Sequence, residues 1–178
     1  VDEEYLVGWQ EGHLPMRKLF CIIITLIYSV TLFAQERITL LFVGDLMQHE
    51  AQIKAAKTTE SYDYSDCFKH VKKEISEADI AIGNLEVTLS GKPYRGYPSF
   101  SAPDEFLYAI KDAGFDVLLT ANNHCLDRGK HGLERTAHLL DSLQIPFLGT
   151  YRTPEDRQLR YPLLIEKNGF RLALLAYT

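Results

Sequence analysis

Three short segments of this 178-residue chain carry side chains that could bind a metal ion or transfer a proton. The densest segment runs from Thr120 to Gly129 and crowds two amides, an imidazole and a carboxylate together. Loops without a chemical task tend toward Gly, Ser and Lys, so this composition indicates a site. The candidates in the segment are Asn122, Asn123, His124, Asp127 and Arg128.

The other two segments have a similar arrangement. Residues 44–50 contain Asp45, and residues 83–86 contain Asn84 and Glu86. Carboxylate, amide oxygen and imidazole ligands together suit Mn, Mg, Fe or Zn, whereas thiolates select softer ions. A divalent ion held by such groups lowers the pKa of its bound water and polarises a phosphoryl or carbonyl oxygen. We therefore expect a site for one or two divalent ions.

Each segment directly follows an apolar run that is typical of a buried strand. These runs, at residues 38–43, 79–82 and 115–119, are rich in β-branched and aromatic side chains. Helical patterns separate them, and right-handed crossovers would make the strands parallel. The carboxyl ends of parallel strands meet at one edge of a sheet, which is where α/β proteins bind ligands. The sequence thus predicts an α/β fold whose three polar segments converge.

Other patterns complete this layout. Residues 163–165 and 170–176 flank Asn168-Gly169, which predicts a hairpin. Residues 89–101 form a long loop with Gly, Pro and aromatic side chains, and such loops often lie over active sites. The remaining expected elements are helices over 64–75, 103–113 and 130–143 and a short strand at 146–148.

In order and spacing, the three segments resemble the CapA family of bacterial capsule (poly-γ-glutamate) synthesis proteins. The motifs that carry this resemblance are Gly44-Asp45-x-Met47, Asn84-Leu85-Glu86 and Ala121-Asn122-Asn123-His124-x-x-Asp127-x-Gly129. The resemblance covers about residues 38–178. It implies a fold similar to the calcineurin-like metallophosphoesterases, a layered α-β-β-α sandwich. Because the further His ligands of that group come from later strands, we expect a truncated, N-terminal part of the domain.

The resemblance also implies roles for individual residues. The expected metal ligands are Asp45, Asn84, Glu86 and Asn123, with His124 as the catalytic acid. Asn84 stands where those enzymes usually have a metal-bridging Asp, and its neutral amide balances less metal charge. Glu86 could compensate, and Asp127 is expected to orient the His124 ring. Asn122, Arg128 and Arg95 are expected to bind an anionic substrate.

Each candidate also has a purely structural alternative. Asp45 and Asp127 could cap a turn or a helix. Asn84 and Asn122 belong to a residue type that is common in turns. His49 could be a further ligand or a solvated loop residue.

The N-terminal part indicates export. Residues 1–15 are acidic and look like an upstream extension that is not native. Residues 16–34 have a basic start, an apolar core and a final Ala34, which fits a secretory signal peptide or, if uncleaved, a membrane anchor. Residues 35–178 would form the CapA-like domain, placed in the periplasm or cell envelope.

The net charge of the chain limits the kinds of binding partner that can be expected. A net charge of −5 without any basic run argues against nucleic acid. Two function classes remain: a metal-dependent hydrolase, cleaving a phosphoester or an amide, and a non-catalytic factor that binds or exports capsule polymer. The expected partners are an anionic capsule polymer and the membrane-bound capsule synthesis machinery. An inactive truncated remnant is the third alternative.

Overall fold

The computed structural model describes residues 15–31 and 36–178 and divides the chain into two compact units, Val1–Glu36 and Arg37–Thr178. The first unit contains helix α1 (Met16–Thr31), and its described side chains are exposed. Among the described residues, no helix combines the length and the apolar character needed to span a membrane. The predicted cleavage position at Ala34 and almost all of the predicted upstream extension lie outside the described residues.

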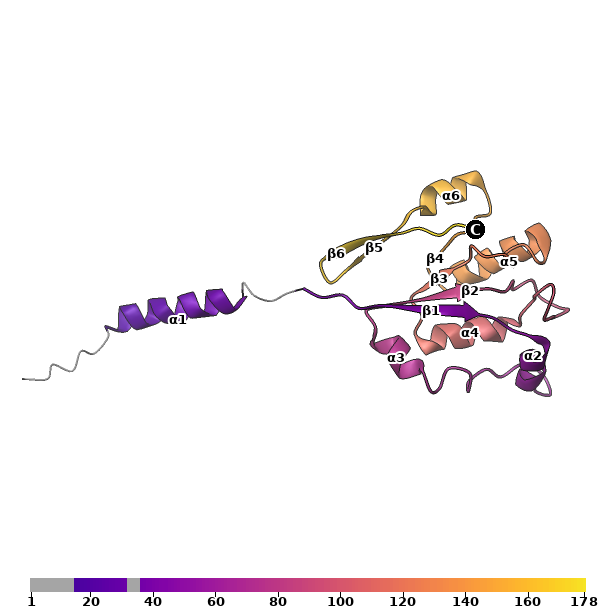
Figure 1. The fold of residues 1–178 in the computed structure, drawn as a ribbon, viewed down its shortest axis with the longest axis horizontal. Coiled ribbons are helices and arrows are strands. Elements are labelled where there is room, and N and C mark those ends of the chain that lie inside the picture. Colours follow the sequence, from indigo (N-terminus) through magenta and orange to yellow (C-terminus); the bar gives the residue numbers. More distant parts are fainter. Residues whose placement is uncertain (1–14, 32–35) are drawn as a thin grey trace, which may run out of the picture. The chain divides into compact units, whose positions relative to one another are not determined.

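The second unit is organised around a parallel sheet of four strands. These are β1 (Leu40–Leu46), β2 (Ile80–Leu85), β3 (Val117–Leu119) and β4 (Phe147–Leu148), in the spatial order β1-β2-β3-β4 (Figure 1). Every neighbouring pair is parallel. The three segments that follow β1, β2 and β3 therefore leave the sheet at the same edge, as the sequence predicted.

Helices cover one face of this sheet. They are α3 (Lys72–Glu77), α4 (Asp104–Ala113) and α5 (Gly129–Ser142). Leu107 and Leu140 from the helices pack with Ala81 and Leu118 from the strands in one core cluster. α4 follows Pro103 and ends at Gly114, which has a φ of 101°. A left-handed conformation of this kind favours glycine, and both boundaries agree with the sequence prediction.

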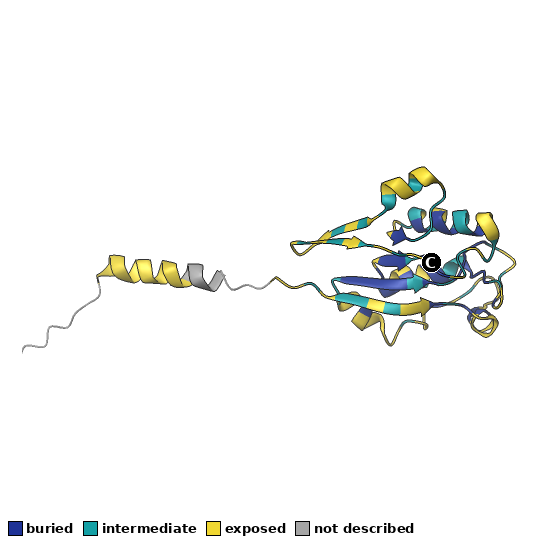
Figure 2. Ribbon diagram, turned by 45° about the horizontal axis from the view of Figure 1, so that its top comes forward, coloured by how far each residue is buried: buried dark blue, intermediate teal, exposed yellow. Residues whose placement is uncertain are grey.

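A hairpin covers the other face. Strands β5 (Leu163–Lys167) and β6 (Phe170–Leu174) pair in an antiparallel sheet, and their inward side chains pack on Ile80, Ile82 and Val117. Figure 2 shows that burial is concentrated in the central strands between these two coverings. Helices, parallel sheet and hairpin thus form successive layers, which confirms the predicted α/β fold class.

Three local expectations were wrong or incomplete. The chain turns through residues 65–71, and α3 begins only at Lys72 rather than near Tyr64. The turn allows the Phe68 ring to contact Phe106 and Phe115, so aromatic packing overrides the helical pattern. The sequence analysis also did not predict α2 (Glu50–Ala56) or α6 (Pro154–Arg160), each seven residues long.

Candidate functional site

The site begins where β1 and β2 end side by side. The register of the two strands shifts between Val43 and Asp45, which leaves Gly44 without a partner. This bulge places Asp45 directly opposite Asn84. Bulges next to functional sites commonly redirect a side chain in this way.

Asn84 lies between two carboxylates. Its Nδ2 donates hydrogen bonds to Asp45 Oδ1 at 2.9 Å and to Glu86 Oε2 at 2.8 Å. Burial, followed by the proximity of Asp45, raises the pKa of Glu86. Two carboxylates that share one donor in a partly buried place would gain from a nearby cation.

Asn122 links the end of β3 to this pair. Its Nδ2 donates to Asn84 Oδ1 at 3.1 Å and to the Leu85 carbonyl at 2.9 Å. Its Oδ1 accepts a hydrogen bond from the backbone N–H of His124 at 3.1 Å. Asn122 is buried, and its hydrogen bond to the Leu85 carbonyl is shielded from water. We call Asp45, Asn84, Glu86 and Asn122 the strand-end cluster.

A second pair lies immediately after the cluster. His124 Nδ1 is 2.9 Å from Asp127 Oδ2, and both side chains are mostly buried, at 15% and 11% exposure. The contact expected between Asp127 and the imidazole is present, and its catalytic role stays a prediction. The His124 ring meets the Phe100 ring edge-on, with centroids 4.6 Å apart.

Asp127 is held by two residues of the loop at 89–101 that the sequence patterns did not indicate. The backbone N–H of Phe100 donates to Asp127 Oδ2 at 2.7 Å, and the Ser99 hydroxyl donates to the Asp127 carbonyl at 2.6 Å. The Phe100 ring also contacts the ring of His49, at 5.0 Å between centroids. The available signal was the long aromatic loop at residues 89–101, which was expected to lie over the site.

Other predicted site residues lie outside this network. Asn123 is exposed, and none of the hydrogen bonds found among the described residues joins it to the strand-end cluster. The backbone of Arg95 pairs with that of Ser101, and its side chain is exposed. Arg128 is the residue that precedes α5. The metal-ligating and substrate-binding roles of these three residues stay predictions.

The donor set suits a hard cation better than a soft one. Within the described residues, no three His, Cys, Asp or Glu side chains come together as a metal site. The strand-end cluster instead offers two carboxylates and two amides. Oxygen donors of this kind fit Mg or Mn.

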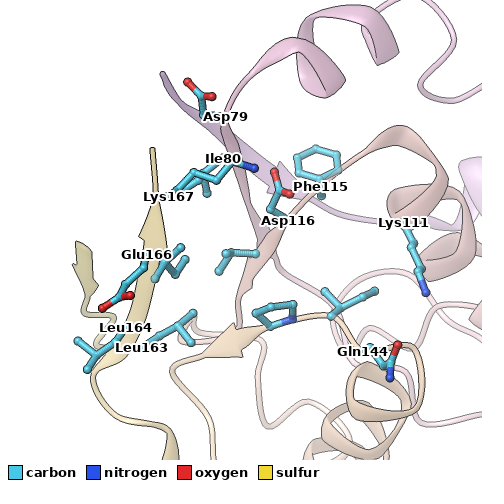
Figure 3. A pocket seen from close by; sticks show the side chains of 14 residues that line it. Asp79, Ile80, Lys111, Phe115, Asp116, Gln144, Leu163, Leu164, Glu166 and Lys167 are labelled. Carbon is cyan, nitrogen blue, oxygen red and sulfur yellow. The ribbon is translucent and has the colours of Figure 1, made fainter. Parts of the chain in front are cut away.

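A hollow of about 530 Å³ lies between the starts of β2 and β3 and the hairpin, at the edge opposite to the strand-end cluster (Figure 3). Its polar groups have structural partners. Asp79 accepts from the Thr39 backbone, and Asp116 Oδ2 accepts from the Ala81 backbone at 2.8 Å. Lys111 Nζ donates to the Leu143 carbonyl at 2.7 Å. The strand-end cluster is therefore the better candidate site.

The parallel sheet, its two coverings and the polar strand ends define an α/β protein of the CapA or metallophosphoesterase-like class. Residues 39–178 match the family described as bacterial capsule synthesis protein PGA_cap, and the chain belongs to that family. The resemblance found in the sequence motifs is thereby confirmed.

Named relatives agree with this assignment. The chain is 29% identical over 149 residues to the capsule biosynthesis protein CapA of Bacillus anthracis, covering 80% of this chain and 35% of that protein. It is 25% identical over 156 residues to the PGA biosynthesis protein CapA of Bacillus subtilis, covering 84% of this chain and 40% of that protein. The chain thus spans well under half the length of these relatives.

Proposed function

We propose that this chain contributes to capsule synthesis through a divalent-metal site at the strand-end cluster, with hydrolase-like chemistry. The observation that carries the proposal is the position of Asn84, whose amide nitrogen holds Asp45 and Glu86 together. The His124–Asp127 pair lies at the end of the neighbouring strand. This combination of anionic ligands with an oriented imidazole suits hydrolysis.

Different residues of the chain would bind the metal ion and transfer the proton. Asp45 and Glu86 would hold the ion, which polarises a substrate oxygen when bound. Asp127 orients His124 through Nδ1–H, which leaves Nε2 for proton transfer, and the ring would give the Nε2 proton to a leaving group when both nitrogens are protonated. Phe100 packs against the imidazole and limits the access of water to it.

The proposed substrate is an anionic capsule polymer of the poly-γ-glutamate type, cleaved at an amide bond, and a separate phosphoester is the alternative substrate. The relative in Bacillus subtilis is named a PGA biosynthesis protein, which supports this choice. Metal charge would attract a carboxylate-bearing chain to a protein whose own net charge is −5.

Export completes the proposal. Met16-Arg17-Lys18 and the apolar residues after it would direct the chain to the cell envelope. Fractionation of cells that express the chain, beside a variant with Ile22→Lys and Ile24→Lys, tests this step. We expect the unchanged chain in the envelope fraction and the variant in the cytoplasm. The same distribution for both would contradict export through this segment.

A non-catalytic polymer-binding factor is the second candidate. The observation that favours it is the direction of the Asn84 amide, which presents its N–H rather than its oxygen to the carboxylates. Such a cluster is already satisfied by hydrogen bonds without an ion. The same strand ends would then present a fixed polar surface to the polymer or to the membrane-bound synthesis machinery.

Metal stoichiometry by mass spectrometry separates the two candidates. The test compares the chain with an Asp45→Asn/Glu86→Gln double variant and with an Asp66→Asn/Glu74→Gln control, which changes exposed acids elsewhere. The hydrolase proposal expects about one bound Mn or Mg ion per chain, lost only in the first variant. Absence of bound metal from the folded chain would favour the binding factor.

Turnover is the second measurement. A chromogenic phosphoester and a poly-γ-glutamate chain serve as substrates, each with and without a chelator. We expect hydrolysis that is abolished by the chelator and falls about 100-fold or more in His124→Ala. Hydrolysis that persists with the chelator and in His124→Ala would come from a contaminant and would overturn the catalytic proposal.

A further inference from the structure

A lysine-lined groove lies between α2 and the loop that covers the site. The hollow measures about 730 Å³. One wall is formed by α2 and the turn after it, and the other by residues 92–94. We infer that this groove binds a linear polycarboxylate chain and directs it toward the strand-end cluster. The inference rests on the proposed capsule-polymer substrate and adds where that polymer lies.

The charges of the groove support an anionic occupant. Lys54, Lys57 and Lys92 line it together with two acids, Glu50 and Glu60, so the lining keeps a positive excess. Lys54 Nζ is 3.6 Å from Glu50 Oε1, whereas the ammonium groups of Lys57 and Lys92 have no ion-pair partner among the described residues. Unpaired cations keep their full attraction for an incoming anion.

Three lysines elsewhere on the surface are paired with acids. Lys69 lies 3.1 Å from Asp66, Lys73 lies 3.8 Å from Glu77, and Lys130 lies 3.6 Å from Glu134, each within one helical turn in the sequence. Their charge is balanced locally. The groove therefore presents available positive charge on a chain that is acidic as a whole.

The shape of the groove suits a flexible chain with apolar segments. Tyr62 and Tyr94 meet edge-to-face across it, with ring centroids 5.2 Å apart. Ile53 and Pro93 add apolar surface. Methylene groups between successive carboxylates can pack on such rings while the lysines pair with the charges. Lysine recognises carboxylates as a point charge and does not need a rigid bidentate geometry.

The α2 wall of the groove is linked to the site by ring contacts. This wall begins at Glu50, next to His49, whose ring contacts Phe100. The covering loop packs closely against the start of α2, because a Cβ added at Gly96 would lie 2.5 Å from the Glu50 backbone nitrogen. Phe100 in turn contacts His124. A chain lying in the groove would therefore approach the imidazole from the α2 side.

Binding of fluorescently labelled poly-γ-glutamate oligomers, followed by anisotropy at low and high salt, tests the inference. The variant is Lys57→Gln/Lys92→Gln, and the matched control is Lys69→Gln/Lys73→Gln. We expect the groove variant to bind about three- to tenfold more weakly, since exposed charge pairs contribute modestly. The control should bind as the unchanged chain does. Glu60→Gln should bind more tightly, because Glu60 lines the same groove.

The outcomes separate this inference from the proposed hydrolase. Both lysine variants leave the strand-end cluster untouched, so their metal content and phosphoester turnover should not change. An equal loss of polymer affinity in the groove variant and the control, or no loss in either, would overturn the assignment of polymer binding to the groove. Equally tight binding of an oligodeoxynucleotide, weakened by the same variant, would overturn its assignment to a polycarboxylate. Polymer binding in the groove by a metal-free chain would contradict only the hydrolase.

Discussion

His124 Nδ1 lies 2.9 Å from Asp127 Oδ2, and the same carboxylate oxygen accepts the Phe100 backbone N–H. One carboxylate therefore orients the imidazole and fixes the loop that covers it. An ionised carboxylate only accepts hydrogen bonds, so the proton of a neutral His124 resides on Nδ1. This assignment leaves Nε2 for chemistry.

Replacement of Asp127 by Asn should disturb both partners. We expect the free energy of unfolding to fall by about 1–3 kcal/mol, because a buried charge-assisted hydrogen bond to Phe100 is weakened. The ¹⁵N resonances of the His124 ring should show loss of the Nδ1–H tautomer. Asp66→Asn is the control, since Asp66 is exposed and pairs with Lys69 at the surface. Unchanged His124 resonances in Asp127→Asn would remove Asp127 from its positioning role.

The two adjacent asparagines should respond differently to truncation. Asn122→Ala removes the link between Asn84 and the Leu85 carbonyl in a buried place and should cost about 1–3 kcal/mol of unfolding free energy. Asn123→Ala changes an exposed side chain and should stay within about 0.5 kcal/mol. Urea denaturation of both variants measures the difference. Metal content then tests the ligand role of Asn123 separately, and a loss of metal in Asn123→Ala alone would support it.

Strand patterns were enough to bring Asp45, Asn84 and Glu86 to one edge, because apolar runs mark buried parallel strands and crossovers set their direction. The direction of an individual side chain in the turn after β3 was not predictable in this way. It depends on backbone angles that tertiary contacts set, and Asn122 rather than Asn123 points inward. The contact of Asp127 with Phe100 joins residues 27 positions apart, which no local pattern encodes.

The raised pKa of Glu86 predicts a stability gain on neutralisation. Burial and the nearby Asp45 disfavour the ionised carboxylate in the folded chain, so stability falls as pH rises above the unfolded pKa of Glu86, and the loss is complete above its folded pKa. Glu86→Gln should therefore raise the melting temperature of the metal-free chain at about pH 7, with no gain at about pH 3.5, where the unfolded carboxyl is also protonated. Thermal melts over this range, beside Glu74→Gln as an exposed control, make the comparison. A lower melting temperature for Glu86→Gln at neutral pH would contradict the cause assigned to the shift.

The lowered pKa of Asp156 predicts a pH dependence of stability opposite to that of Glu86. Its carboxylate accepts hydrogen bonds from Arg152 and, at 2.5 Å, from Arg160 Nε, and Arg152 also pairs with Asp141 of α5. These guanidinium groups hold the pKa of Asp156 well below its usual range. The ionised form thus stabilises the folded chain at every pH above the unfolded pKa, and the contribution is lost as pH falls toward the depressed value.

Asp156→Asn should consequently lower the free energy of unfolding by about 1–3 kcal/mol at neutral pH. The half-buried guanidinium groups of Arg152 and Arg160 would lose their ionised acceptor. The difference from the unchanged chain should shrink below about pH 4, because the Asp156 carboxyl of the unfolded chain then takes up a proton that the folded chain binds only at lower pH. Denaturant unfolding of both proteins across this pH range provides the measurement. Glu166→Gln is the matched control, since Glu166 pairs with Arg171 in an exposed place and should contribute little. A pH-independent difference for Asp156→Asn would show that its packing, and not its charge, joins α6 to α5.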